Sequence, residues 1–434
     1  MKDKLILKEV LEKINPSKEE LDYIGKFLKG FIKDLSSKLR TSKVKAEVFV
    51  GGSFAKKTMI RKDRYDVDVF VRFDESFIGK DISNVLENVL KKMKNKFSVI
   101  HGSRDYFKID VNEYFFLEII PVIKVKNPKD AENITDLSYF HVGYIRKKVK
   151  TEKMLEEIRL AKAFCHANKC YGAESYIHGF SGYALELIVY HYGSFMKFIK
   201  AMTKIKDAKD NFSKEIIDIE KLYKSKYEVS INLNSAKMSS PIVLIDPTYK
   251  ERNALAALSS ETFYEFKKTC INFLKKPSLE GFEIQKADLV KIKKRADKNK
   301  LEFIELRTET DKQEGDIAGS KLVKFYHHLS EEIKIFYDIK DNDFEYNGEK
   351  SAEFFFVVKN KGEILFEGPY AKDKSSVAKF KKRHKKTFNK KGRIYCKEKF
   401  KDKIEKFIKD WKSKNCQKMI EMHITSLEMV NQID

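Results

Sequence analysis

The sequence predicts a multi-domain α/β protein with a mixed sheet in its first part. Its 434 residues exceed the size of one ordinary domain, and the apolar fraction of 42% is sufficient for buried cores. Strand and helix patterns alternate at first, helical patterns dominate the middle, and both types return near the end. We therefore expect a head over residues 1–145, a helical neck over 146–275, and a mixed α/β body and tail over 276–434.

The predicted head contains helices and strands in a mixed order. Apolar residues recur at helical spacing over 3–40, with a break near Pro16, and again over 81–95. Runs rich in aromatic and β-branched residues, bounded by turn residues, predict four strands. These are Glu47–Val50, Tyr65–Phe73, Tyr106–Val111 and Tyr114–Val125, the last two joined by a tight turn at Asn112-Glu113. This order suits a small sheet that is partly antiparallel.

The predicted neck is mainly helical. Helices are expected after the capping residue Thr151, from near Ser181, and over Ser259–Phe273. We also expect a basic linker over Lys197–Lys226 and a short strand over Ile242–Ile245.

The predicted body and tail carry both patterns. The expected helices are Leu289–Asn299, Ser320–Tyr337, Asp373–Arg383 and Lys401–Lys414. Glu302–Arg307 is expected to be extended, and Glu353–Lys359 is expected to form a hairpin with Gly362–Glu367. The tract from Lys379 to Arg393 has nine Lys or Arg in fifteen residues, which suits either an RNA contact or a solvated helix face or loop.

The bulk composition bears on partners and compartment. With 88 Lys and Arg against 65 Asp and Glu, the net charge is +23, which favours nucleic acid as a partner unless a lysine-rich proteome explains it. The five cysteines are odd in number and show no CxxC spacing, so we expect free thiols and neither a disulfide framework nor a zinc site. The first residues do not resemble a signal peptide, and no stretch of 18 apolar residues is free of charge. We expect a cytoplasmic protein that does not bind a membrane.

The segment Val48–Val71 carries the most specific pattern, VFVGGSFAKKTMIRKDRYDVDVFV. Asp66 and Asp68 lie two residues apart on a predicted strand, so both carboxylates point to one face, about 7 Å apart. This spacing suits two divalent metals about 3.5–4 Å apart. The turn that includes Gly52 and Ser53 can direct backbone N–H groups and a hydroxyl at phosphate oxygens. The two features together indicate a nucleotidyl-transfer centre.

A third acidic ligand is expected on a neighbouring strand, and two residues compete for this role. Glu118 lies within FFLEIIPV, where an acid is costly unless it is paired or bound to metal. Asp110 lies near a turn, where a solvated acid is ordinary. We therefore favour Glu118, with an edge-strand salt bridge as the alternative reading.

The order GGSFAKKT, DVDVFV and LEIIPV resembles the nucleotidyltransferase superfamily of DNA polymerase β-like folds. Two longer segments resemble the archaeal-type (class I) CCA-adding enzymes more specifically. They are RLAKAFCHANKCYGAESYIHGFSGYALELIVYHYGSF at Arg159–Phe195 and VLIDPTYKERNALAALS at Val243–Ser259. The segment GPYAKDKSSVAKFKKRHKKTFNKKGRIY is similar to the tail region of that family. The resemblance implies a nucleotidyltransferase-fold head that is followed by a neck, a body and a tail.

The resemblance implies a role for each matching residue. Asp66, Asp68 and Glu118 would hold Mg2+ and act in catalysis, while Gly52, Ser53 and Lys56 would contact the triphosphate. The remaining residues implied around the nucleotide are His141, Lys162, Tyr171 and Arg252. By pattern alone, Lys162 would be a solvated lysine, His141 a core histidine, Tyr171 a packing residue and Arg252 a surface residue.

The implied reaction adds CMP, CMP and AMP to the 3′ end of tRNA from CTP and ATP, without a template, and releases pyrophosphate. Another untemplated ribonucleotide polymerase, such as a poly(A)-adding enzyme, is the alternative within enzymes. A catalytically silent RNA-binding relative is the alternative outside them. The sequence does not fix the oligomeric state, and a homodimer stays open.

Three features depart from the family pattern. Glu118 stands where Asp is usual, and Lys56 stands where Arg is common, which loses a bidentate phosphate contact. The loop Met59–Arg64 is strongly basic and lacks the usual small glycine-containing turn. None of these changes removes a required chemical group.

Overall fold

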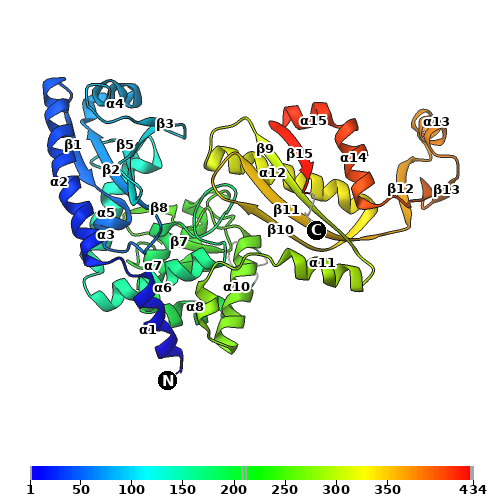
Figure 1. The fold of residues 1–434 in the computed structure, drawn as a ribbon, viewed down its shortest axis with the longest axis horizontal. Coiled ribbons are helices and arrows are strands. Elements are labelled where there is room, and N and C mark those ends of the chain that lie inside the picture. Colours follow the sequence, from blue (N-terminus) through cyan, green and yellow to red (C-terminus); the bar gives the residue numbers. More distant parts are fainter. Residues whose placement is uncertain (1, 207–209, 211–212, 431–434) are drawn as a thin grey trace. The chain divides into compact units, whose positions relative to one another are not determined.

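The protein is a mixed α/β structure of two compact units, Met1–Gln285 and Lys286–Asp434 (Figure 1). The computed structural model describes residues 2–206, 210 and 213–430. The predicted fold class is confirmed. The finer division of the first unit into a head and a neck stays a prediction. Among the described residues, no helix is both long and apolar enough to cross a membrane.

The first unit opens with two helices that Pro16 separates, as predicted. Ser17 ends the break by capping the second helix, with a reciprocal contact from Glu20. The elements of this part are α1 (Lys2–Ile14), α2 (Lys18–Thr41), β1 (Ala46–Val50), α3 (Gly52–Lys56), β2 (Tyr65–Phe73), α4 (Ile82–Leu90), β3 (Ser98–Ile100), β4 (Tyr106–Asp110), β5 (Phe115–Ile123) and α5 (Ser138–Lys148). Short 3₁₀ turns occupy Glu75–Phe77, Pro128–Asp130 and Ile134–Leu137.

The five strands form one sheet in the order β1-β2-β5-β4-β3. β2 and β5 are parallel, and the other neighbours are antiparallel, so the predicted mixed sheet is confirmed. Alternate residues of β2, such as Val67 and Val69, are fully buried against α2 and α4 on one face. The opposite face of β2 therefore carries Asp66 and Asp68.

Helices dominate the rest of the first unit. The elements are α6 (Glu152–Ala167), α7 (Gly182–Tyr192), α8 (Phe195–Lys204), β6 (Glu215–Ile217), α9 (Lys226–Asn232), β7 (Ile242–Asp246), β8 (Tyr249–Asn253) and α10 (Ser260–Lys275), with a 3₁₀ turn at Leu279–Phe282. The predicted cap Thr151 accepts a backbone N–H in the first turn of its helix, and so do Ser181 and Ser259, near which the next two helices were expected to begin.

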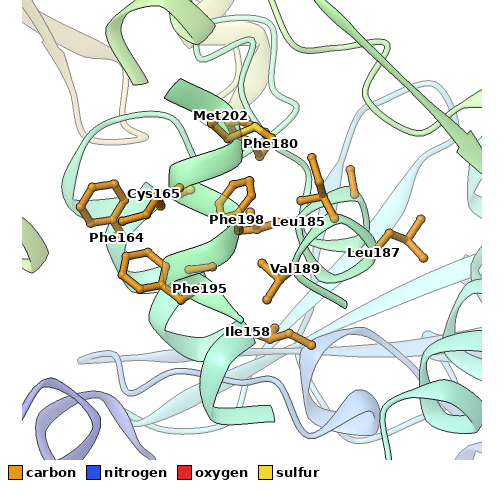
Figure 2. Packing of buried hydrophobic residues seen from close by; sticks show 14 of the residues in the cluster. Ile158, Phe164, Cys165, Phe180, Leu185, Leu187, Val189, Phe195, Phe198 and Met202 are labelled. Carbon is orange, nitrogen blue, oxygen red and sulfur yellow. The ribbon is translucent and has the colours of Figure 1, made fainter. Parts of the chain in front are cut away.

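The core of this helical part is built from α6, α7 and α8. Figure 2 shows Phe164 of α6 and Leu185 of α7 with Phe195 and Phe198 of α8, and all four are fully buried. The predicted linker over Lys197–Lys226 is wrong in its first part, because α8 runs through it. Its lysines lie on the solvent side of an amphipathic helix whose other side is buried. Residues 207–209 and 211–212 of that prediction lie outside the described part of the chain.

The second unit contains two sheets. Its elements are α11 (Leu289–Lys298), β9 (Glu302–Thr310), α12 (Asp316–Phe336), β10 (Tyr337–Tyr346), β11 (Ser351–Asn360), β12 (Glu363–Tyr370), α13 (Lys374–Arg383), β13 (Thr387–Lys390), β14 (Arg393–Lys399), α14 (Ile404–Lys414), α15 (Cys416–Glu421) and β15 (Ile424–Met429). One sheet has the order β10-β11-β9-β15, and the other has the order β12-β14-β13.

The predicted hairpin between β11 and β12 is wrong, although both strands exist. β11 pairs with β10 along one edge and with β9 along the other, so neither edge is open to β12. β12 pairs with β14 in the second sheet instead.

Candidate active site

The structure brings the three predicted acids onto one face of the first sheet. β2 and β5 are parallel neighbours, and their register places Asp68 beside Glu118 and Asp66 beside Phe116. Side chains at paired positions of neighbouring strands point to the same face. Asp66, Asp68 and Glu118 therefore form one carboxylate group on the face opposite the buried core.

The competing acid, Asp110, shares this face of the sheet but lies two strands away from Asp68 and pairs with a basic side chain. It is on β4, beyond β5, and pairs across the sheet with Phe116. Its carboxylate is exposed and lies 2.6 Å from Arg64 Nη2. The geometry therefore favours Glu118 as the third member of the carboxylate group.

Crowding of the carboxylates changes their proton affinity. Burial, together with the charges of Asp68 and Asp66, raises the pKa of Glu118 to about 8. Burial and the charge of Asp66 raise the pKa of Asp68 to about 6. Asp66 is more exposed, and its Oδ1 lies 2.8 Å from the ammonium group of Lys62.

Gly52 lets the backbone pack against the carboxylate of Asp68. Its φ of +57° is unfavourable for other residues, and a Cβ placed on it would lie 1.6 Å from Asp68 Oδ2. Gly51 is similarly tight, because its Cβ would lie 2.2 Å from the ring of Phe70. The predicted glycine–serine turn is the start of the short helix α3, in which Ser53 is the second residue.

A buried ion cluster adjoins this group. The ammonium groups of Lys56 and Lys162 lie 2.7 Å and 2.8 Å from the two oxygens of Glu186. Thr58 donates its hydroxyl to the same carboxylate at 2.6 Å and accepts from Lys162 at 2.8 Å. Glu186 and Thr58 are fully buried and Lys162 is 2% exposed. Lys162 is therefore not a solvated lysine.

The cluster stays charged despite its burial. Burial by itself would raise the pKa of Glu186, but the ammonium groups of Lys162 and Lys56 outweigh it and hold the pKa at about 2. Burial lowers the pKa of Lys56, and the attraction of Glu186 opposes that change. Two ammonium groups share one carboxylate, so the cluster has a surplus positive charge. This charge lies beside Asp68, and the ammonium group of Lys56 also stabilises the ionised form of the Asp68 carboxylate.

Sequence reasoning missed Glu186, although a signal was present. It lies in ALELIVY, where an acid among apolar residues of a helix is as costly as Glu118 in its strand. The same reasoning would have found Asp246, which ends the fully buried strand β7.

Asp246 forms ion pairs with two of the residues predicted to contact the nucleotide. His141 Nε2 and Arg252 Nη1 lie 3.0 Å and 2.8 Å from Asp246 Oδ2. Tyr183 and Thr248 donate to its other oxygen at 2.9 Å and 2.8 Å. Burial would raise the pKa of Asp246, but His141 and Arg252 outweigh it and lower that pKa. His141 also stacks on Tyr183, with ring centres 3.9 Å apart.

Tyr171 lies near both charged groups. Burial, with the charges of Glu186 and Asp66, raises the pKa of its hydroxyl. Its ring stacks on His166 with centres 4.1 Å apart. A Cβ on Gly182 would lie 2.7 Å from the Tyr171 hydroxyl, so the start of α7 also needs a glycine at this position. The predicted site residues thus lie in adjoining groups of the first unit.

Comparison with known proteins gives matches to two families and to several curated proteins. Residues 156–283 match the family "tRNA nucleotidyltransferase, second domain". Residues 1–138 match the "Second Messenger Oligonucleotide or Dinucleotide Synthetase domain" family. The CCA-adding enzyme of Nanoarchaeum equitans is 37% identical over 259 residues, which are 60% of this chain and 62% of that protein. Over this part of its length, the chain is similar to an archaeal CCA-adding enzyme.

Two further archaeal CCA-adding enzymes extend the relationship. That of Methanocaldococcus jannaschii is 30% identical over 64% of this chain and 61% of its own length. That of Saccharolobus shibatae is 30% identical over 67% of this chain and 64% of its own length. The chain thus spans a little over three fifths of each of these relatives. The predicted resemblance is confirmed.

The solved structures that resemble this chain have lower sequence identity to it than the curated proteins. A crystal structure of the Cid1 poly(U) polymerase has a TM-score of 0.49 and 14% identity, over 64% of this chain and 98% of that chain. This likeness is too distant to support an argument about function.

We predict that Glu186→Gln destabilises the first unit by about 3–5 kcal/mol, because it leaves two buried ammonium groups without their counter-charge. Denaturant unfolding followed by circular dichroism measures this loss. Glu265→Gln is the matched control, because Glu265 pairs with Lys268 at 3.0 Å on the surface of α10. Equal stability of the two variants would contradict the role given to Glu186.

Proposed function

We propose that this protein is a CCA-adding tRNA nucleotidyltransferase. It would add and repair the 3′-terminal CCA of tRNA from CTP and ATP, without a nucleic-acid template, and release pyrophosphate. The observation that carries the proposal is the shared face of Asp66, Asp68 and Glu118 in a chain related to the archaeal CCA-adding enzymes. The surplus positive charge around Glu186, beside these acids, suits a triphosphate.

The carboxylate group fits divalent cations. Nucleotidyltransferases of this kind generally use divalent metal ions. The group offers only oxygen donors, which Mg2+ prefers, and burial together with the charges of Asp68 and Asp66 raises the pKa of Glu118 to about 8. Asp66, Asp68 and Glu118 would therefore hold Mg2+. When bound, the metal would activate the attacking 3′-hydroxyl and stabilise the leaving pyrophosphate.

The remaining predicted residues have separate tasks in this proposal. Lys56 and Lys162 would neutralise triphosphate oxygens, with Glu186 fixing both ammonium groups in place. Ser53 would add a hydroxyl contact beside them. His141 and Arg252, which Asp246 orients, would contact the nucleotide, and so would Tyr171.

The basic character of the chain supports tRNA as the acceptor. The net charge of +23 suits a long polyanion, and the exposed lysines around α13 belong to the tract Lys379–Arg393. Double-stranded RNA is recognised mainly through its shape and phosphates, for which dispersed lysines are sufficient. We therefore assign tRNA backbone contacts to the body and tail.

An incorporation assay tests the proposal directly. The substrate is tRNA that ends at the discriminator base, incubated with CTP and ATP, and the product is read by sequencing. The proposal requires a CCA end. A long A tract would identify a poly(A)-type polymerase instead, and RNA binding without incorporation would identify a silent relative.

We predict that Glu118→Gln lowers the rate of CMP incorporation at least about 100-fold, because it removes charge from the proposed metal site. Asp66→Ala should have an effect of similar size. Asp110→Asn is the matched control, since its carboxylate pairs with Arg64 on the surface of the same sheet, and its rate should stay near that of the unaltered protein. Similar losses in Glu118→Gln and Asp110→Asn would refute the assignment of the third acid.

We predict that Lys62→Met strengthens Mn2+ binding without nucleotide, by up to about fivefold. The ammonium group of Lys62 lies 2.8 Å from Asp66 Oδ1 and therefore competes with a cation for that oxygen. Isothermal titration calorimetry measures the change. Lys91→Met, which breaks an ion pair of equal length with Glu87, should leave Mn2+ affinity unchanged. Weaker binding by Lys62→Met would show that Lys62 does not compete.

A further inference from the structure

The lobe formed by β12, α13, β13 and β14 in the second unit has little hydrophobic core. In the segment Glu363–Lys399, all of which the structure describes, the buried hydrophobic side chains are Ile364, Ile394 and Cys396. Every residue of α13 is at least partly exposed. Large side chains such as Leu365 and Tyr370 remain 52% and 59% exposed. Elements of this size usually need a disulfide or a metal in addition to such a core.

Three metal-ligating side chains meet inside this lobe. His384 directly follows α13, while Cys396 and Glu398 lie two residues apart on the central strand β14 and so share one face. One donor atom from each lies within 4.8 Å of the others. His384 Nδ1 is 2.7 Å from Glu398 Oε1, and Cys396 Sγ is 3.7 Å from the same oxygen.

The surroundings hold the His384 ring in position. The ring packs against Phe380 of α13 and Phe366 of β12, with centres 4.4 Å and 5.1 Å apart. Phe380 in turn lies close over Gly368, where a Cβ would come within 2.9 Å of its ring. Two neighbouring elements therefore orient the imidazole toward β14.

The donor set selects the type of metal. A thiolate, an imidazole nitrogen and a carboxylate oxygen are zinc ligands, whereas Mg2+ and Ca2+ prefer oxygen donors alone. Zinc bonds of about 2.0–2.3 Å at tetrahedral angles separate the donors by about 3.3–3.8 Å. Cys396 and Glu398 already have this separation, and His384 and Glu398 would need to part by about half an ångström.

Charge and access also favour a zinc ion. On zinc binding the Cys396 thiol would release its proton, and the resulting thiolate and the Glu398 carboxylate would together neutralise the dication in a region already rich in lysine. The Glu398 side chain is 45% exposed, which leaves a path for entry and room for a water molecule as the fourth ligand. The sequence lacks a CxxC signature because one of these donors follows α13 and the other two lie on β14.

We propose that His384, Cys396 and Glu398 bind one Zn2+, which fastens the end of α13 to β14. Zinc binding would stabilise the lobe that carries the Lys379–Arg393 tract, because the ordered site exists only when both elements are in place. The proposal does not depend on the catalytic function, since its residues belong to the second unit.

Metal analysis of the full chain tests the proposal. The protein is purified in an Asp66→Asn/Asp68→Asn background, which weakens binding at the other carboxylate group, and is dialysed against zinc-free buffer. Mass spectrometry of the metal content should give about one Zn2+ per chain. Cys396→Ser should lower this content at least about tenfold. Cys416→Ser, at an exposed thiol of α15, should retain it. Equal zinc contents in these two variants would overturn the proposal.

Cobalt substitution provides a second test that does not depend on how a variant folds. Co2+ added to the metal-free full chain should produce a thiolate-to-metal charge-transfer band, which Zn2+ abolishes. Removal of zinc should also accelerate tryptic cleavage within Lys379–Arg393 relative to sites in the first unit. A full chain without the cobalt band would show that His384 and Glu398 form only a hydrogen bond.

Discussion

The first unit depends on one buried carboxylate, that of Glu186. Glu186 lies on α7, and its two lysine partners lie on α3 and α6. A single ion cluster therefore joins the short helix α3, which lies between β1 and β2, to the helical core. Two ammonium groups without a counter-ion would not remain charged at such burial. Glu186 therefore allows Lys56 and Lys162 to be cations beside the carboxylate group. If the protein acts on nucleotides as proposed, this is the condition for a triphosphate to bind there.

The close approach of Gly52 to Asp68 is a second constraint at the same place. The helix α3 carries Lys56 and begins where its backbone lies against the Asp68 carboxylate. The position of the lysine is thus tied to the position of the acid through a few residues of backbone. Because the neighbours are packed, a larger residue at Gly52 would move both groups together.

Local patterns in the sequence were sufficient for the carboxylate group but not for its surroundings. Asp66 and Asp68 follow from strand alternation, and Glu118 follows from the cost of an acid in an apolar strand. The parallel pairing of β2 with β5 determines that Glu118 lies beside Asp68, and no local pattern specifies that register. Glu186 and Asp246 are, like Glu118, acids within apolar segments. Their partners are distant in sequence, so no local pattern identified the ion clusters that they form.

The errors elsewhere have a related cause. Lysines at every third or fourth position of α8 gave Lys197–Lys226 the composition of a linker, and the burial of Phe198 overrode that composition. The turn between β11 and β12 has hairpin chemistry, yet pairing depends on which strand edges are free. Both outcomes were decided by tertiary packing, which a short window of sequence does not contain.

The charges of the candidate site are nearly balanced in the absence of ligands. Lys62 pairs with Asp66, Arg252 pairs with Asp246, and a surplus ammonium charge lies near Asp68. A divalent cation alone would leave this region too positive, and a bare triphosphate would leave it too negative. On the proposed function, metal and nucleotide each supply the charge that the other lacks. Their binding should therefore be mutually reinforcing, since a favourable coupling acts equally on both ligands.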